Sequence, residues 1–138
     1  VAADPTVLVD AAHNPHGAAS LAKALDTYFT FDDVTVVLAI FEDKDADGII
    51  EALAPMATRF IVTNAPSERS RSARDLGFLV ADKVGDDKVL VEADPVVALA
   101  MARGYAANSE KGAVVVTGSI TLVGLTVGLA AETQGWTL

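Results

Sequence analysis

The sequence predicts an α/β fold with an open, mostly parallel sheet of about five to six strands and helices on both faces. Short runs rich in valine and isoleucine recur along the chain. They are continuous rather than alternating, which is typical of strands buried on both faces of a sheet. Segments with helical spacing of apolar residues separate these runs. This alternation of strand and helix indicates parallel strands joined by right-handed crossovers.

Each predicted strand is a short apolar run. The five runs are TVLVD at 6–10, VTVVLAIF at 34–41, RFIVTN at 59–64, KVLVE at 88–92 and AVVVTG at 113–118. Each predicted helix is a stripe of apolar residues three and four positions apart. The stripes are Ala18, Leu21, Ala22, Leu25, Tyr28 and Phe29; Ile49, Ile50, Leu53 and Ala57; Ala73, Leu76, Val80 and Val84; and Ala98, Met101, Ala102 and Tyr105.

Two segments need a separate interpretation: the end of the second predicted helix and the long apolar segment near the end of the chain. Pro55 stands late in the second stripe, so we expect the helix to bend or end there. The apolar segment 113–131 approaches the length of a membrane span, but Thr117, Gly118 and Ser119 interrupt it. No Lys, Arg or aromatic belt flanks its far end. We therefore predict a buried strand followed by a helix, and no membrane partner.

Composition predicts one soluble domain, residues 1–138. The 138 residues include 19 acidic and 10 basic ones, and the net charge of −9 disfavours nucleic acid as a partner. The absence of cysteine excludes disulfides and thiolate metal sites, and with no signal-peptide pattern at the start it favours the cytoplasm. Because the chain begins abruptly just before a strand, we interpret it as a domain of something longer.

Ligands of open parallel sheets bind beyond the carboxyl ends of the strands, so polar residues there are the candidates. In LVDAAHNPHG, at 8–17, Asn14 and Pro15 are explained as a helix cap and first helical residue. Asp10 and His13 are not explained in that way. They direct polar groups to a helix N-terminus, which attracts anions. A phosphate or carboxylate site and a purely structural loop both remain open here.

Acidic residues and a lysine follow the second strand, in FEDKDADG at 41–48. A calcium loop would need a closing Glu and flanking helices, and a preceding strand contradicts it. Asp45 or Asp47 is expected to cap the next helix. Lys44, between two aspartates, is a candidate positioned ammonium.

Two further segments lie at strand ends. NAPSERSRSARD, at 64–75, gathers Arg69, Arg71 and Arg74, which could bind an anionic substrate or could form a charged surface loop with Glu68 and Asp75. Ser119, after the last strand, is either a helix cap or a hydroxyl facing the same crevice as His13. The glycine motifs of hydrolases, dinucleotide-binding folds and P-loop enzymes are absent.

Three blocks together carry a family signal. DAAHNPHG at 10–17 resembles the Asp-Gly-Ala-His-Asn-Pro block of the Mur ligase superfamily, in particular of folylpolyglutamate and bifunctional dihydrofolate synthases. FEDKD at 41–45 resembles their Asp-Lys-Asp block, and VVVTGSITLVG at 114–124 resembles their Thr-Gly-Ser block. The resemblance covers only the C-terminal domain of those enzymes, whose sheet is of the open, Rossmann-like kind. Ala11 stands where the family has Gly, and LTVGLAAE after Gly124 departs from the usual acid and arginine.

The resemblance implies an ATP-dependent amide ligase that adds L-glutamate to folate or dihydropteroate through an acyl phosphate. It implies that Asp10, His13 and Asn14 approach ATP, and that His13 also acts as the catalytic residue near the incoming amino acid. Lys44, Asp45, Arg71 and Ser119 are predicted to lie at the glutamate site. The phosphate loop and the Mg²⁺ ligands are expected in an N-terminal ATPase domain that this sequence lacks, so the isolated domain is expected to be inactive.

Two alternatives remain open. A Mur ligase proper, which adds an amino acid to a cell-wall precursor, shares the His-Asn-Pro block, although the other two blocks favour the folate branch. A stand-alone, non-catalytic α/β module that binds a small anion in the crevice is an alternative of a different class.

Overall fold

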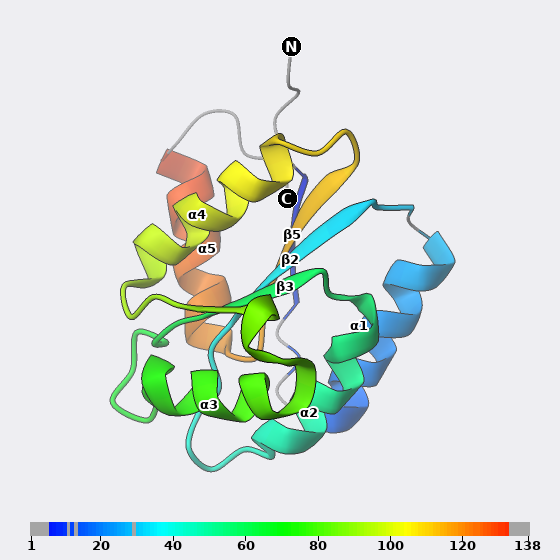
Figure 1. Cartoon of the computed structure of the whole chain (residues 1–138). Helices are drawn as coiled ribbons and strands as arrows, with labels where there is room; N and C mark the ends of the chain where they lie inside the picture. The colour runs from blue at the N-terminus through cyan, green and yellow to red at the C-terminus, as the bar shows by residue number, and fades with distance from the viewer. Residues whose placement is uncertain (1–5, 11, 13, 29, 133–138) are drawn as a thin grey trace.

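The computed structural model describes residues 6–10, 12, 14–28 and 30–132. Strands and helices alternate, as the sequence predicted (Figure 1). The elements are β1 (Thr6–Val9), α1 (Pro15–Tyr28), β2 (Asp33–Leu38), α2 (Ala46–Leu53), η1 (Ala54–Met56), β3 (Arg59–Val62), α3 (Ala73–Val84), η2 (Asp86–Lys88), β4 (Val89–Val91), α4 (Pro95–Ala107), β5 (Gly112–Thr117) and α5 (Ile120–Glu132). The strands form one parallel sheet in the order β1-β5-β2-β3-β4.

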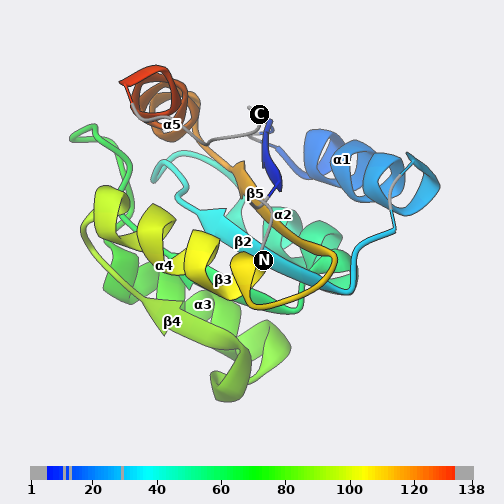
Figure 2. The same cartoon turned by 90° about the horizontal axis from the view of Figure 1, so that it is seen from above.

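Helices cover both faces of the sheet, which confirms the predicted fold class. Apolar residues of α1, α2 and α3 pack on one face against Val36, Leu38 and Val115. Residues of α4 and α5 pack on the other face against Val37 and Val114. Figure 2 shows α1 and α5 on opposite sides of β1 and β5. Both faces of β2 and β5 are therefore buried, as their continuous apolar runs indicated.

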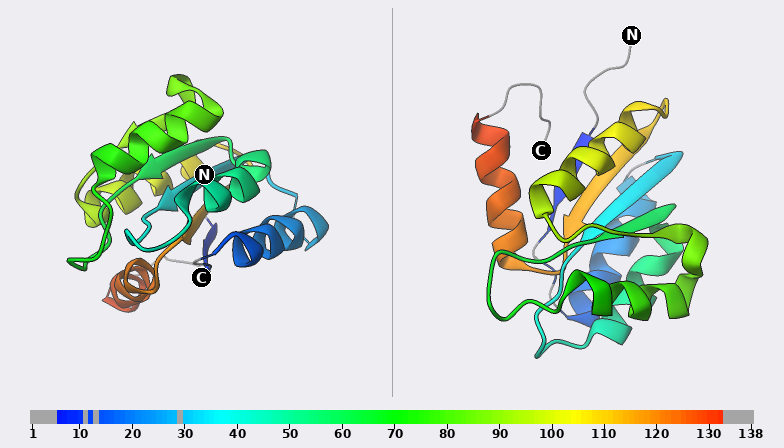
Figure 3. Two further views of the ribbon diagram at one scale, coloured as in Figure 1. Left: turned by 90° about the horizontal axis from the view of Figure 1, so that it is seen from below. Right: turned by 60° about the vertical axis from the view of Figure 1, so that its left-hand side comes forward.

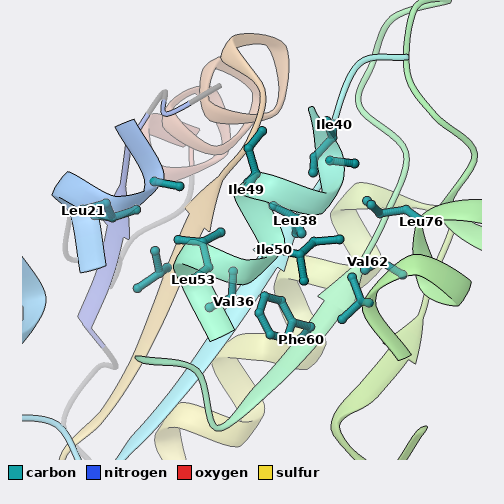
Figure 4. Packing of buried hydrophobic residues seen from close by; sticks show 14 of the residues in the cluster. Leu21, Val36, Leu38, Ile40, Ile49, Ile50, Leu53, Phe60, Val62 and Leu76 are labelled. Carbon is teal, nitrogen blue, oxygen red and sulfur yellow. The ribbon is translucent and has the colours of Figure 1, made fainter. Parts of the chain in front are cut away.

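The core on the α1–α3 face fixes the loop between β2 and α2. Leu38, Ile49, Ile50 and Leu53 have no exposed surface, and Phe60 is 1% exposed. Figure 4 shows these side chains converging between α2 and the strands. Burial of one such side chain stabilises a fold by about 1.5–3 kcal/mol. The cluster therefore holds α2, and with it the residues that lead into α2, at a fixed place on the sheet.

The second helix ends at its proline. α2 stops at Leu53, and Pro55 lies in the short 3₁₀ turn η1 that follows. Ala57 belongs to the predicted stripe but lies outside the helix, with an extended backbone. The proline ring removes a hydrogen-bond donor and cannot continue an α-helix, so the turn tightens instead.

The second strand is shorter than its apolar run of 34–41. β2 ends at Leu38, whose register partners are Val62 at the end of β3 and Thr117 at the end of β5. Because both neighbours end there, the next residues have no ladder to join. They enter the loop at the carboxyl edge of the sheet.

A half-buried ion pair joins β2 to β3 near the amino ends of the strands. Both guanidinium nitrogens of Arg59 bind the carboxylate of Asp33, at 2.6 Å and 3.1 Å, and Nη1 also donates to Thr35 Oγ1 at 2.7 Å. The guanidinium lies 4.2 Å from the ring centre of Tyr105 on α4. This cluster ties one end of the sheet to α4.

Within the described ranges, every helix is too short or too polar to cross a membrane. The apolar segment 113–131 divides between β5 and α5, as expected from the interruption at Thr117, Gly118 and Ser119.

Candidate functional site

The candidate site lies at the carboxyl end of β5, where the direction of the crossovers changes. The helices that follow β1 and β2 pack on one face of the sheet, whereas α5, which follows β5, packs on the other. β5 lies between β1 and β2. Adjacent connections that leave toward opposite faces open a crevice at the strand ends, and ligands of parallel sheets bind there. Figures 1 and 3 show the start of α5 beside the loop that follows β2.

The tip of β1 contributes Asp10 and Asn14. The Asp10 amide donates to Val116 O at 3.0 Å, and its carboxylate Oδ1 accepts from the Ala12 amide at 2.8 Å. Asn14 Oδ1 accepts from the Gly17 amide at 2.7 Å, so Asn14 caps α1 as predicted. Both side chains are exposed at the crevice end of the strand. His13, the predicted catalytic residue, lies outside the described residues.

The tip of β5 turns sharply at Gly118. Its φ of 96° lies in the region that favours glycine, and a Cβ there would run into Ala39 O on the neighbouring strand end. The turn places Ser119 at the start of α5, 2% exposed, where its hydroxyl shares a 2.8 Å hydrogen bond with Thr121 Oγ1. Thr117 is fully buried, and its hydroxyl has no hydrogen-bond partner.

The loop after β2 runs from Ala39 to Asp45. The carboxylate of Asp45 accepts from the Gly48 amide at 3.0 Å and caps α2, which is the structural role expected for Asp45 or Asp47. A Cβ on Gly48 would lie 2.6 Å from Pro15 Cγ, so the first turns of α1 and α2 touch. The start of α1 and the start of α2 therefore lie side by side at the carboxyl edge of the sheet.

The loop after β3 runs from Thr63 to Ser72, and the three arginines of this loop and the start of α3 have different surroundings. Arg69 forms a 3.0 Å ion pair with Asp43 and lies 4.7 Å from the ring centre of Phe41. Arg71 Nη2 donates to Glu42 O at 3.0 Å and to Lys44 O at 2.8 Å. Arg74 lies over the ring of Phe78 on α3. The predicted partners Glu68 and Asp75 form no ion pair with them among the described residues.

The charge of Asp43 is influenced by this loop. Desolvation raises the pKa of its carboxyl, but its own backbone hydrogen bond and the positive charges of Arg69 and Lys44 lower it. The net pKa lies below the ordinary value of 3.8. Asp43 is therefore ionised at neutral pH and partly offsets the charge of Arg69. Lys44 forms no ion pair with any described residue.

One small cavity brings part of the predicted site together. Its volume is about 160 Å³, and it is lined by Phe41, Lys44, Arg69, Gly118, Ser119 and Ile120. Lys44 and Ser119 were both predicted for the amino-acid site. Asp45 and Arg71 do not line the cavity, because their side chains bind backbone atoms beside it.

Sequence reasoning did not single out two of the lining residues, Phe41 and Ile120. Phe41 and Ile120 are single apolar residues next to a polar motif, and nothing in their pattern separates them from core residues. Arg69 belonged to the predicted arginine cluster, but only the path of its loop shows that it faces Lys44.

A larger cavity, of about 720 Å³, lies between the second half of α1 and η1, at the amino ends of the strands. It includes none of the predicted site residues, so its size does not make it the candidate site. Within the described ranges, no group of three or more His, Asp or Glu side chains could hold a metal ion.

Comparison with known proteins identifies relatives over most of the chain. Residues 1–120 match the family model described as "Mur ligase, glutamate ligase domain". The dihydrofolate synthase/folylpolyglutamate synthase of Mycobacterium tuberculosis is 41% identical over 85 residues, which are 62% of this chain and 18% of that protein. A probable bifunctional folylpolyglutamate synthase/dihydropteroate synthase of Haloferax volcanii is 32% identical over 120 residues, 87% of this chain and 14% of that protein.

Solved structures share the fold. Folylpolyglutamate synthase of Mycobacterium tuberculosis, complexed with ADP and AMPPCP, superposes with a TM-score of 0.86 at 35% identity and covers 91% of this chain. Folylpolyglutamate synthase of Thermotoga maritima superposes with a TM-score of 0.75 at 32% identity and also covers 91%. The chain spans 29% and 28% of those two structures, and less of the curated relatives. With the match of the family model over 1–120, the chain belongs to the Mur ligase family as a glutamate ligase domain.

Proposed function

We propose that this chain is the C-terminal domain of an ATP-dependent amide ligase that adds L-glutamate to folate or dihydropteroate through an acyl phosphate. The observation that carries the proposal is the cavity that both Lys44 and Ser119 line, at the crossover change beside β5. Relatives named folylpolyglutamate synthase support the choice of substrates.

The cavity suits an amino acid that carries carboxylates. Two cationic side chains, Lys44 and Arg69, and one buried hydroxyl line it, whereas no acidic side chain does. Guanidinium and ammonium groups bind carboxylates through charge-assisted hydrogen bonds. In this proposal Lys44 and Ser119 hold the amino acid so that its amine faces the activated carboxyl group. The predictions that Asp45 and Arg71 touch the amino acid stay predictions, because both side chains bind backbone atoms here.

Asp10 and Asn14 are proposed to approach ATP, as the resemblance implies. Their position supports this role, because both side chains are exposed at the carboxyl end of β1, beside the N-terminus of the 14-residue helix α1, where phosphate groups bind favourably. Bound ATP would supply the phosphoryl group that activates the substrate carboxylate. Mg²⁺ ligands are proposed to come from the N-terminal ATPase domain. The catalytic role of His13 and the cytoplasmic location stay predictions.

The alternatives are less well supported. The named relatives are folylpolyglutamate or dihydrofolate synthases, which favours the folate branch over cell-wall ligases. A stand-alone anion-binding module would have the same crevice but no ligase activity when an ATPase domain is attached.

The test is to join the chain to the N-terminal portion of the Mycobacterium tuberculosis folylpolyglutamate synthase, whose matching domain it would replace. Glutamate- and ATP-dependent ligation to dihydropteroate or a reduced folate is then measured. Replacing Lys44 with Met should lower kcat/KM for glutamate by about 10- to 100-fold, as expected for a lost hydrogen bond to a charged group. Lys88→Met, on exposed η2, is the matched control and should have no effect. Equal activities of the two variants would contradict the proposal.

A further inference from the structure

The loops after β2 and β3 are joined along their backbones. Phe41 and Ser70 form an isolated antiparallel bridge. The Glu42 amide donates to Arg69 O at 2.8 Å, and the Arg71 amide donates to Ile40 O at 2.9 Å. The two loops therefore form a short ribbon that continues beyond the carboxyl end of the sheet. The ribbon ends before Lys44, so it does not by itself fix the peptide that carries this lysine.

The side chain of Arg71 connects this ribbon to the peptide of Lys44. Its Nη2 donates to Glu42 O at 3.0 Å and to Lys44 O at 2.8 Å, so a single nitrogen binds the carbonyls on both sides of Asp43. The residue is half-buried, and its Nε is buried without a hydrogen-bond partner. The planar guanidinium holds its N–H donors in a fixed geometry, whereas the lysine ammonium rotates at the end of a flexible stem and would hold the two carbonyls less rigidly.

These contacts determine the direction of the Lys44 peptide. The other bonds of the segment are the turn from the Lys44 amide to Phe41 O, at 3.1 Å, and the cap by Asp45 on α2. Neither of these bonds uses the carbonyl of Glu42 or the carbonyl of Lys44. With both carbonyls bound to Arg71, the backbone that carries Lys44 is held where this residue lines the same cavity as Ser119.

We propose that Arg71 is a positioning residue, which fixes the Lys44 loop before any substrate binds. The effect of Arg71 on ligation rests on the proposed function of the chain, whereas its effect on the order of the Lys44 loop does not. A charge held in place in advance needs no reorganisation when the substrate arrives, and such preorganisation is a main source of catalytic stabilisation. In this role Arg71 acts through Lys44 and has no need to touch the amino acid.

Arg69 differs from Arg71 although it belongs to the same loop. Its contacts are an exposed ion pair with Asp43, in which the two side chains are 62% and 56% exposed, and a ring contact with Phe41. Exposed ion pairs of this kind contribute little. Arg69→Ala is therefore a matched control that removes a guanidinium group from the same loop and leaves both carbonyl contacts of Arg71 intact.

The test is backbone ¹⁵N relaxation of residues 42–44 in the 138-residue chain without ligand. In Arg71→Ala, the order parameters of these residues should fall from about 0.85, typical of rigid backbone, to below about 0.6. Arg71→Lys should recover the order only in part, and it provides the measurement if Arg71→Ala does not fold. Arg69→Ala should stay near the wild-type value. Wild-type order in both Arg71 variants would overturn the proposal.

Kinetics of the joined enzyme separate the two proposals. If Arg71 positions Lys44, Arg71→Ala should raise KM for glutamate and lower kcat together, by about tenfold overall, and Arg71→Lys should restore only part of the loss. A loop that loses order without a change in kinetics would support the positioning role and contradict the proposed role of Lys44 in ligation. Unchanged order with a raised KM alone would contradict the positioning role.

Discussion

Gly118→Ala tests whether the turn after β5 positions Ser119. The φ of 96° places this residue in a conformation that costs an L-residue about 1–2 kcal/mol. The new Cβ would also run into Ala39 O and lie 2.8 Å from Leu38 Cδ1, in a fully buried part of the sheet. Overpacking of a core costs about 1–3 kcal/mol. We therefore expect the free energy of unfolding to fall by about 2–5 kcal/mol, a large share of the roughly 5–15 kcal/mol of a typical domain.

Urea denaturation measures this loss. At an m value of about 2 kcal/mol/M, the midpoint should fall by about 1–2.5 M with m unchanged. Gly124→Ala is the control, because Gly124 is an exposed residue of α5 and the added Cβ would meet no atom of another part of the chain within 4 Å. That variant should gain up to about 1 kcal/mol, since glycine weakens a helix relative to alanine. If the two variants unfold at the same midpoint, the turn does not depend on glycine and the reasoning is wrong.

Three further predictions concern single interactions. Arg59→Ala should lower the free energy of unfolding by about 3–5 kcal/mol, measured by urea denaturation, because Asp33 would remain half-buried without its partner; a loss below 1 kcal/mol, typical of exposed pairs, would contradict this. The hydrogen bond from Lys83 to Glu51 raises the pKa of the lysine above 10.5. At neutral pH the wild-type chain should therefore be more stable than the Glu51→Gln variant. This difference should disappear as the pH rises through the raised pKa, and a constant difference in alkali would refute the pair. Ser119→Ala should lower ligation by the joined enzyme at least tenfold with a loss of only about 1 kcal/mol in stability, and full activity would exclude the hydroxyl from the site.

The sheet could be predicted from the sequence because its central strands are buried on both faces. The apolar runs of 34–41 and 113–118 correspond to β2 and β5, whose residues 34–38 and 113–117 are all fully or almost fully buried. Strand ends were less predictable. Ala39 and Ile40 are as apolar and as buried as the strand before them, but their neighbours β3 and β5 have already ended. Strand length is thus determined by the partners, which a single apolar run does not contain.

The sequence predicted the part of the candidate site that depends on the order of the strands, and it did not predict the part that depends on contacts between loops. Lys44 and Ser119 each follow a strand, so the parallel sheet places both at one edge, and the position of β5 beside β2 brings them together. The role of Arg71 depends instead on the ribbon formed by two loops, through bonds between backbone atoms. Backbone pairing between loops leaves no pattern in residue types, so the sequence predicted the basic cluster but not which arginine lines the cavity.

The size of the cavity bears on whether this domain works alone. At about 160 Å³ it is smaller than the roughly 300–1,000 Å³ of sites that enclose a whole small molecule. It has room for part of a substrate, such as one amino acid, but the described residues that line it all come from the segments that follow β2, β3 and β5. ATP and a folate would need further walls, and the crevice beside β1 is open on the side of Asp10 and Asn14. Joined to an ATPase domain, the chain should gain a site that excludes water from an acyl phosphate, which hydrolysis would otherwise destroy. Without that domain we expect no measurable ligation, and turnover by the 138-residue chain alone would contradict this division of the site.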